Sequence, residues 1–289
     1  MDALLIGVRF LHFGAAMLLF GIAAFEAGLL PAGLRTRFAW WAVLRVLLVA
    51  LLVATGGLWF MLETANIGSG WADAFDPAAL SVVATDTMFG QVWVVRLVLI
   101  VLLVPALWLR GAAGRALFVV AVAAVLGSLG FVGHAAMEEG VAGSVHRVNH
   151  MLHLLASGFW VGSLPPLLAC LVVLRRDPAA AGTTLQRFSG LGHLAVALTL
   201  VTGVVNTVLV LGAWPVDFSS PYQALLALKI LLVAVMVGIA LYNRYVSTVQ
   251  LGRRPESSAR ALVSGTIGEI VLGAIVIALV SAFATYAPV

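Results

Sequence analysis

Residues 3–29 read ALLIGVRFLHFGAAMLLFGIAAFEAGL, an apolar stretch whose ionisable side chains are Arg9, His12 and Glu26. An α-helix of about 20 predominantly apolar residues is long enough to cross the hydrocarbon core of a bilayer. This stretch is longer than the apolar core of a signal peptide, and no basic segment precedes it. We therefore expect a transmembrane helix here and not a cleaved signal.

Seven further stretches resemble the first in length and composition. The expected spans are 3–29, 40–62, 89–109, 115–133, 147–174, 186–211, 222–246 and 261–286. The longer connection over residues 63–87 is expected to hold a short surface helix around residues 76–84. The sequence thus predicts an all-α, polytopic integral membrane protein, a single bundle of eight transmembrane helices.

The composition supports a membrane protein. Of the 289 residues, 63% are hydrophobic and 10% are charged, and the mean hydropathy is +1.12. A soluble chain of this length has no interior large enough for so much apolar surface, so the lipid bilayer is the expected partner. No nucleic acid partner is expected, because the basic residues lie in short clusters between apolar stretches. The single cysteine, Cys170, excludes an intramolecular disulfide and a paired-thiolate metal site.

The charged residues of the connections segregate by sign. Alternate connections, starting after the first span, carry Arg35, Arg37, Arg110, Arg115, Arg175, Arg176, Arg253, Arg254 and Arg260. The remaining connections carry Glu63, Asp73, Asp76, Asp86, Glu138, Glu139 and Asp217, with Arg147 as their only basic residue. Because arginine-rich connections stay in the cytoplasm, we expect both termini on the non-cytoplasmic side.

Residues that recur in the same order in both halves predict an internal duplication. The corresponding pairs are His12 and His153, Gly21 and Gly162, Thr55 and Thr202, and Arg96 and Lys229, the first two at a constant offset of 141 residues. Four spans repeated in the same orientation would form a parallel repeat about an axis along the membrane normal. We expect the two four-helix repeats to cover about residues 1–133 and 146–289.

Histidine and methionine gather in the half of the membrane opposite the arginine-rich connections, which holds five of the six histidines. The candidate metal ligands are His134, His150, His153 and His12, with His146, Met137 and Met151 as helpers. Imidazole and thioether together suit copper, because thioether favours Cu+ and imidazole accepts Cu+ or Cu2+. A hard cation would instead need converging carboxylates.

Several ionisable residues in the spans have a structural alternative. Arg9, Arg96 and Lys229 either reach the outer surface and pair with Asp86, Glu63 or Asp217, or hold an anionic group. We expect Glu26 to pair with Arg35, Arg37 or Arg260, and His193 to be structural. Glu269 is the better candidate for an ion relay.

The segment over residues 148–164, VNHMLHLLASGFWVGSL, resembles the signature of the CopD/PcoD family of copper-resistance membrane proteins. That family carries His-Leu-Leu-Ala followed by Trp-x-Gly-x-Leu, which His153 and Trp160 match. His134 matches a Gly-His pair of the family. The segment 187–189, the pair Thr202-Gly203 and the eight-span layout also match, so the resemblance covers essentially the whole chain.

The resemblance implies copper homeostasis or resistance at the bacterial inner membrane, with copper moving from the periplasm to the cytoplasm. It also implies a periplasmic copper-binding partner, which would be a separate protein because no such domain follows the last span. We expect a transporter and not an enzyme, and no P-loop motif suggests ATP use. Two alternatives remain: an oxidoreductase that binds haem between His12 and His153, and a non-transporting copper chaperone or oxidase-assembly factor.

Overall fold

The computed structural model describes residues 2–132, 140–173, 177–250, 253–283 and 286. Its described residues contain eight helices that are long and apolar enough to cross a membrane, which confirms the predicted spans. The long helices are α1 (Asp2–Ala24), α2 (Trp41–Ile67), α4 (Met88–Ala106), α5 (Gly111–Gly127), α6 (Gly140–Val173), α7 (Pro178–Leu211), α8 (Pro221–Tyr242) and α10 (Pro255–Phe283).

Short elements extend or connect the long helices. They are the π-helical turns η1 (Phe25–Leu29) and η6 (Asn243–Ser247), the 3-10 turns η2 (Ala32–Phe38) and η3 (Ser128–Phe131), and the helices α3 (Pro77–Asp86) and α9 (Thr248–Gln250). The helix α3 is the short helix expected between the second and third spans. It begins where Asp76 accepts a hydrogen bond from the Ala78 amide at 2.9 Å and Pro77 takes the first helical position.

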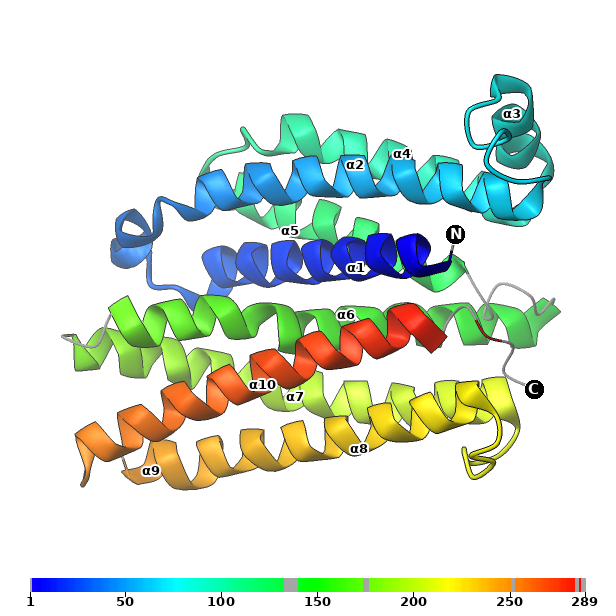
Figure 1. Cartoon of the computed structure of the whole chain (residues 1–289). Coiled ribbons are helices and arrows are strands. Elements are labelled where there is room, and N and C mark those ends of the chain that lie inside the picture. The colour runs from blue at the N-terminus through cyan, green and yellow to red at the C-terminus, as the bar shows by residue number, and fades with distance from the viewer. Residues whose placement is uncertain (1, 133–139, 174–176, 251–252, 284–285, 287–289) are drawn as a thin grey trace.

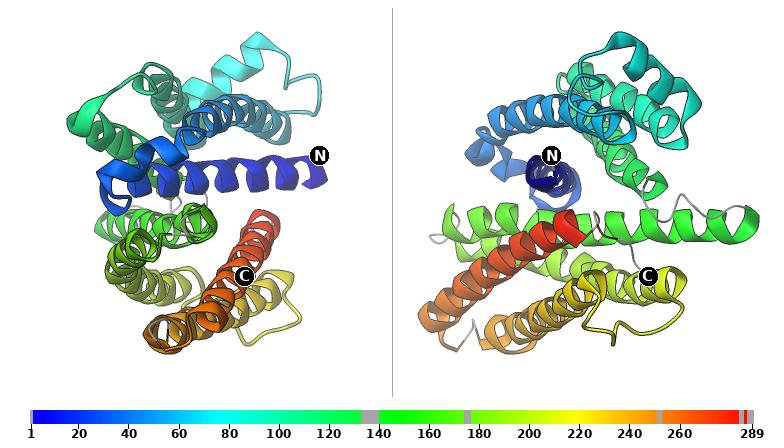
Figure 2. Two further views of the ribbon diagram at one scale, coloured as in Figure 1. Left: turned by 90° about the vertical axis from the view of Figure 1, so that its left-hand side faces the viewer. Right: turned by 45° about the vertical axis from the view of Figure 1, so that its right-hand side comes forward.

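The helices α1 and α6 lie side by side at the centre of the bundle (Figure 1), and the other long helices of each half lie on either side of this pair (Figure 2). The two backbones come very close where Gly21 of α1 meets Gly162 of α6. A Cβ atom on Gly21 would lie 1.9 Å from the Gly162 carbonyl oxygen, and one on Gly162 would lie 1.9 Å from that of Met17. Only glycine fits at this crossing, as at many helix contacts in membranes.

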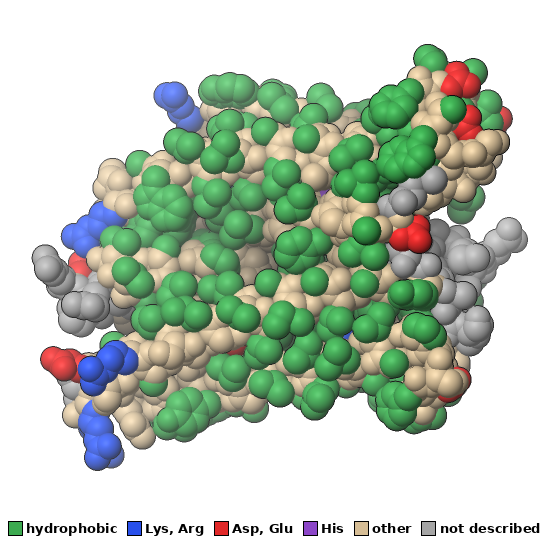
Figure 3. Space-filling view, viewed as in Figure 1, with side chains coloured by type: hydrophobic (Ala, Val, Ile, Leu, Met, Phe, Trp, Pro, Cys, Tyr) green, Lys and Arg blue, Asp and Glu red, His purple; other side chains and the backbone are tan. Residues whose placement is uncertain are grey.

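The long sides of the bundle are apolar and the ends are charged. Val43, Leu47 and Val101 are more than half exposed, as expected for side chains that face lipid. Arginine side chains gather at one end, and most acidic side chains lie at the other (Figure 3). We call the first the arginine-rich end; it holds the turns after α1, α4 and α8, which carry Arg37, Arg110 and Arg253. The helix α1 begins, and α10 ends, at the opposite end (Figure 1).

Candidate metal-binding site

His12 lies at the centre of a hydrogen-bonded cluster in the first half of the chain. The side chain projects from α1 and is fully buried. Its Nδ1 atom lies 2.8 Å from Thr55 Oγ1 of α2, while the Thr55 hydroxyl donates to the Leu51 carbonyl oxygen at 2.6 Å. The hydroxyl proton is thus already used, so His12 Nδ1 carries the ring proton and donates it to Thr55. The lone pair of the ring is left on Nε2.

Arg96 of α4 occupies that lone pair. Its Nη2 atom donates to His12 Nε2 at 2.6 Å, while Nη1 donates to Ser128 Oγ at 2.6 Å and to the Val125 carbonyl oxygen. The guanidinium is fully buried and does not reach the outer surface or pair with Asp86, Glu63 or Asp217, so that alternative was wrong. Acceptors from α1, α5 and η3 hold this cation inside the bundle.

Two tryptophans close the space around His12. The Trp59 ring packs edge-on against the imidazole with ring centroids 5.6 Å apart, and the Trp93 ring lies 6.1 Å away. Trp93 is itself held by a hydrogen bond from its indole nitrogen to the Gly56 carbonyl oxygen at 3.0 Å. The first-half cluster is therefore enclosed by aromatic rings and by a cation.

His153 makes the corresponding contact in the second half of the chain. Its Nδ1 atom lies 3.0 Å from Thr202 Oγ1 of α7, and the Thr202 hydroxyl donates to the Leu198 carbonyl oxygen at 2.5 Å. By the same reasoning, Nδ1 carries the proton and Nε2 carries the lone pair. The ring also has a hydrogen-bond contact with the Thr199 backbone of α7, and no described side chain donates a hydrogen bond to His153 Nε2, so this lone pair is available.

His150 lies beside His153 on α6, with ring centroids 6.5 Å apart and planes inclined by 13°. Two asparagines position it. Asn206 of α7 donates to His150 Nδ1 at 3.3 Å, and Asn149 donates to Asn206 Oδ1 at 2.8 Å and to the Thr202 carbonyl oxygen at 3.0 Å. The face of α6 that meets α7 thus presents two neighbouring imidazoles held by side-chain hydrogen bonds, which is how proteins orient metal-binding histidines.

In each half of the chain, a histidine lies against a threonine and the glycine that follows it. A Cβ atom on Gly56 would lie 3.6 Å from His12 Cε1, and one on Gly203 would lie 3.2 Å from His153 Cε1. The predicted duplication requires such a match, and it stays a prediction. The halves differ at the cation. Lys229, which corresponds to Arg96, lies 5.8 Å from the centroid of the Phe283 ring and makes no hydrogen bond to His153 in the described structure.

The remaining predicted ligands are dispersed. His146 is buried on α6, and Met151 packs against Gly127 of α5 and Gly130 of η3. His134 and Met137 lie outside the described residues. No group of three or more His, Cys, Asp or Glu side chains in the described regions is placed to hold a metal ion. The structure brings His150 and His153 together and places His12 with Arg96.

Sequence reasoning missed the residues that support these histidines. Asn149, Asn206 and Ser128 are polar side chains within apolar spans, and that property alone would have singled them out. Glu26 does form an ion pair, but its carboxylate meets Arg45 of α2 at 2.8 Å, while the predicted partner Arg35 donates to the Glu26 backbone carbonyl oxygen at 3.3 Å. Arg45 was overlooked because it lies inside a span and not in a connection.

Comparisons with known proteins identify the family of this chain. Residues 1–144 match the family described as "Copper resistance protein D-like, N-terminal domain", and residues 182–283 match the family described as "Copper resistance protein D". The chain is 36% identical to "Inner membrane protein YebZ" of Escherichia coli (strain K12), over 98% of each chain. No solved structure matches.

Two further relatives carry copper in their names. "Copper resistance protein D" of Pseudomonas syringae pv. tomato is 31% identical, over 85% of this chain and 82% of its own. "Copper transport protein CutJ" of Bacillus subtilis (strain 168) is 30% identical, over 60% of this chain and 34% of its own. This chain therefore belongs to the copper resistance protein D (CopD) family, as a copper-related, multi-pass protein of the inner membrane.

Proposed function

We propose that this protein binds copper at His150 and His153 and moves it across the inner membrane, from the periplasm to the cytoplasm. The family and the names of two relatives support a role in copper handling. The chemistry of the candidate ligands agrees, because imidazole nitrogen is a good ligand for copper in either oxidation state.

The observation that carries this proposal is the lone pair on His153 Nε2. The hydrogen bond to Thr202 holds the ring proton on Nδ1 and so leaves the lone pair of the neutral ring on Nε2. In the described residues, no donor occupies this lone pair. A neutral imidazole with one nitrogen held and the other free is prepared to coordinate a metal. His12 is held by Thr55 in the same manner, but Arg96 occupies its second nitrogen. His12 therefore serves packing in this proposal and is not a copper ligand.

The charge distribution supports a position of the candidate site on the periplasmic side, where the proposed transport would begin. Arginine-rich connections stay in the cytoplasm, so the arginine-rich end is expected to face it. His150 and His153 lie in the half of α6 that begins at the opposite end, toward the periplasm. A separate periplasmic copper-binding protein would deliver the ion there. Met151 on that side would assist the transfer, as would Met137, which the sequence predicts as a helper.

The haem alternative is less well supported by the site. A haem between His12 and His153 would need the Nε2 atoms of both rings, and that of His12 accepts a hydrogen bond from Arg96 at 2.6 Å. A visible spectrum of the purified protein tests this directly, because a haem gives a strong absorption band and Cu+ gives none.

Transport is tested with the full chain reconstituted in vesicles that contain a trapped Cu+ indicator. We expect Cu+ influx with the wild-type protein and its loss with His153→Ala. His12→Ala is the control, and it should keep the copper affinity of the wild type. Copper binding without influx would instead assign the protein to the non-transporting chaperones or assembly factors.

A further inference from the structure

Glu269 of α10 is a buried carboxyl group that the copper site does not use. Only 3% of its surface is exposed, and it lies midway along a membrane-spanning helix. Its Oε1 atom accepts a hydrogen bond from Trp160 Nε1 of α6, and its Oε2 atom accepts one from Asn243 Nδ2 of η6, both at 3.3 Å. Both donors are neutral and both bonds are long, so together they stabilise a negative charge only weakly.

The described structure gives Glu269 no cationic partner. Glu26 shows the contrast, because Arg45 lies 2.8 Å from its carboxylate within the first half of the bundle. An unpaired carboxylate in an apolar membrane interior is costly, and a buried acid without a partner becomes neutral by taking up a proton. Glu26 is thus expected to be ionised and Glu269 to be protonated.

The hydrogen bonding of Asn243 is compatible with a proton at this place. Its amide nitrogen donates to Glu269, but its buried Oδ1 atom has no hydrogen-bond donor. A protonated Glu269 supplies a donor to this amide oxygen when the amide turns over, because nitrogen and oxygen occupy equivalent ends of the side chain. A carboxylate, which only accepts, cannot do so.

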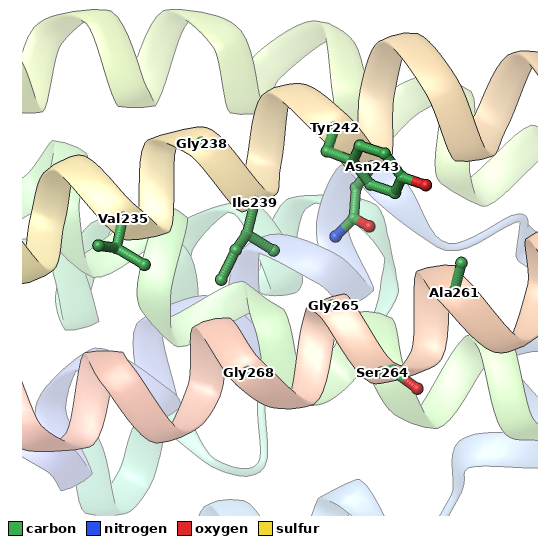
Figure 4. Close-up of a pocket in the computed structure, with 9 residues that line it drawn as sticks. All are labelled: Val235, Gly238, Ile239, Tyr242, Asn243, Ala261, Ser264, Gly265 and Gly268. Atoms are coloured by element: carbon green, nitrogen blue, oxygen red, sulfur yellow. The ribbon is translucent and has the colours of Figure 1, made fainter.

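Gly265 and a π-helical turn allow Asn243 to reach the carboxyl group. The Asn243 side chain points from its helix toward α10, where Gly265 faces it (Figure 4). A Cβ atom on Gly265 would lie 2.5 Å from Asn243 Oδ1 and 2.6 Å from Nδ2. Asn243 is also the first residue of η6, and such π-helical turns within α-helices are frequent at functional sites.

A cavity of about 260 Å³ borders Glu269 and extends from it toward the arginine-rich end. It lies between α6, α7, α8 and α10, and its walls include Trp160, Glu269 and, further along, Thr248. The other titratable groups that line it are His193 of α7 and Arg244 of η6. His193 donates from Nδ1 to the Ser189 carbonyl oxygen at 2.6 Å and accepts from the Tyr245 hydroxyl at 3.3 Å. Arg244 forms no ion pair with Glu269 in the described structure.

From these observations we infer that Glu269 is a proton-binding site, protonated at neutral pH and loaded through this cavity from the arginine-rich end. On release, the carboxyl O–H bond breaks, the proton passes to water in the cavity, and the carboxylate keeps the electron pair. Trp160 and Asn243 then hold the anion through the hydrogen bonds that they already make. The inference needs no copper and stands independently of the proposed transport.

Infrared spectroscopy of the copper-free, full-length protein tests this site. The sample is prepared in a detergent without ester carbonyl groups, so that the C=O stretching band of a protonated carboxylic acid is visible. We expect such a band at neutral pH in the wild-type protein, its loss at strongly alkaline pH, and its loss at every pH in Glu269→Gln.

The matched control is Glu26→Gln, which removes an ion-paired carboxylate and should leave the band in place. A second variant, Asn243→Ala, keeps the carboxyl group but removes a hydrogen-bond partner, so it should shift the frequency of the band. Asn243→Ala therefore tests whether the band belongs to Glu269 even if Glu269→Gln does not fold. Absence of the band from the wild-type protein at neutral pH, or an unchanged frequency in Asn243→Ala, would overturn the inference.

Discussion

Thr55 and Thr202 have the same effect on two different histidines. Each donates its hydroxyl proton to the preceding turn of its own helix and accepts the proton of a histidine Nδ1 atom. In its neutral form, each histidine therefore carries the proton on Nδ1 and a lone pair on Nε2. At the scale of single residues, the difference between the two halves of the protein is that Arg96 occupies one lone pair and the other remains available.

This difference predicts opposite outcomes for two alanine substitutions. His153→Ala removes an available ligand and should lower copper affinity at least tenfold, or about 1.4 kcal/mol. His12→Ala removes a ring whose nitrogens are both in use, so copper affinity should stay unchanged even if the protein melts at a lower temperature. Competition titration of each purified variant against a Cu+ chelator measures this, and equal losses in the two variants would contradict the assignment.

His134 and His193 form a second pair for comparison. His134 is a predicted ligand from the Gly-His pair of the family, so His134→Ala should also lower bound copper and the cellular copper phenotype. His193 is hydrogen-bonded to Ser189 of α7 and Tyr245 of η6, on the side of the bundle nearer the arginine-rich end and away from His153, so His193→Ala should change neither. Metal analysis of the purified variants checks this. Wild-type copper binding in both His134→Ala and His153→Ala, with normal expression, would show that the proposed copper site is wrong.

At the scale of elements, the contact between α1 and α6 connects the two halves of the chain. It depends on backbone approach at Gly21 and Gly162, where any side chain meets the backbone of the facing helix. Lipid supplies little apolar driving force for helix association, so close packing of this kind is a main source of stability. Side chains on both helices, including His12 and His153, are placed by this contact.

Gly21→Ala should therefore destabilise the protein, by about 1–3 kcal/mol, because the added methyl group forces α1 and α6 apart. Gly14→Ala on the same helix is the matched control, since a Cβ atom there would meet nothing within 4 Å. It should be neutral or stabilising by up to about 1 kcal/mol, because alanine favours a helix more than glycine does. Thermal unfolding in detergent compares the two. Equal melting temperatures in the two variants would show that the close contact at Gly21 does not determine the stability of the protein.

At the scale of the whole molecule, the segregation of charge predicts the orientation in the membrane. Reporter fusions after Pro31, Gly111, Asp177 and Arg254 should report the cytoplasm. Fusions after Gly70, Gly140 and Asp217 should report the periplasm, because the arginine clusters lie in the other connections. Alkaline phosphatase and fluorescent-protein activities measure the two sides. Two reporters on the wrong side would contradict the orientation with both termini outside, and with it the proposed direction of transport.

Composition and the positions of charged residues were sufficient to predict the all-helical, eight-span fold. Lipid imposes this result locally, because each span must satisfy its own backbone hydrogen bonds and be long enough to cross the bilayer. The helix α3 is also recognisable from local sequence, because Asp76 caps its N-terminus and Pro77 occupies its first helical position. The pairing of Glu26 was also predicted, although its partner was not.

The tertiary structure alone decided how the polar residues inside the spans are used. The sequence placed His12 and His153 in equivalent positions, but it does not show that Arg96 crosses to one ring while Lys229 makes no hydrogen bond to the other. Nor does it show that Asn243 meets Glu269 across two helices, or that Glu26 meets Arg45. These contacts depend on the rotation and spacing of helices that are distant in sequence. That packing is set by close approaches such as Gly21 on Gly162, to which residues from the whole bundle contribute.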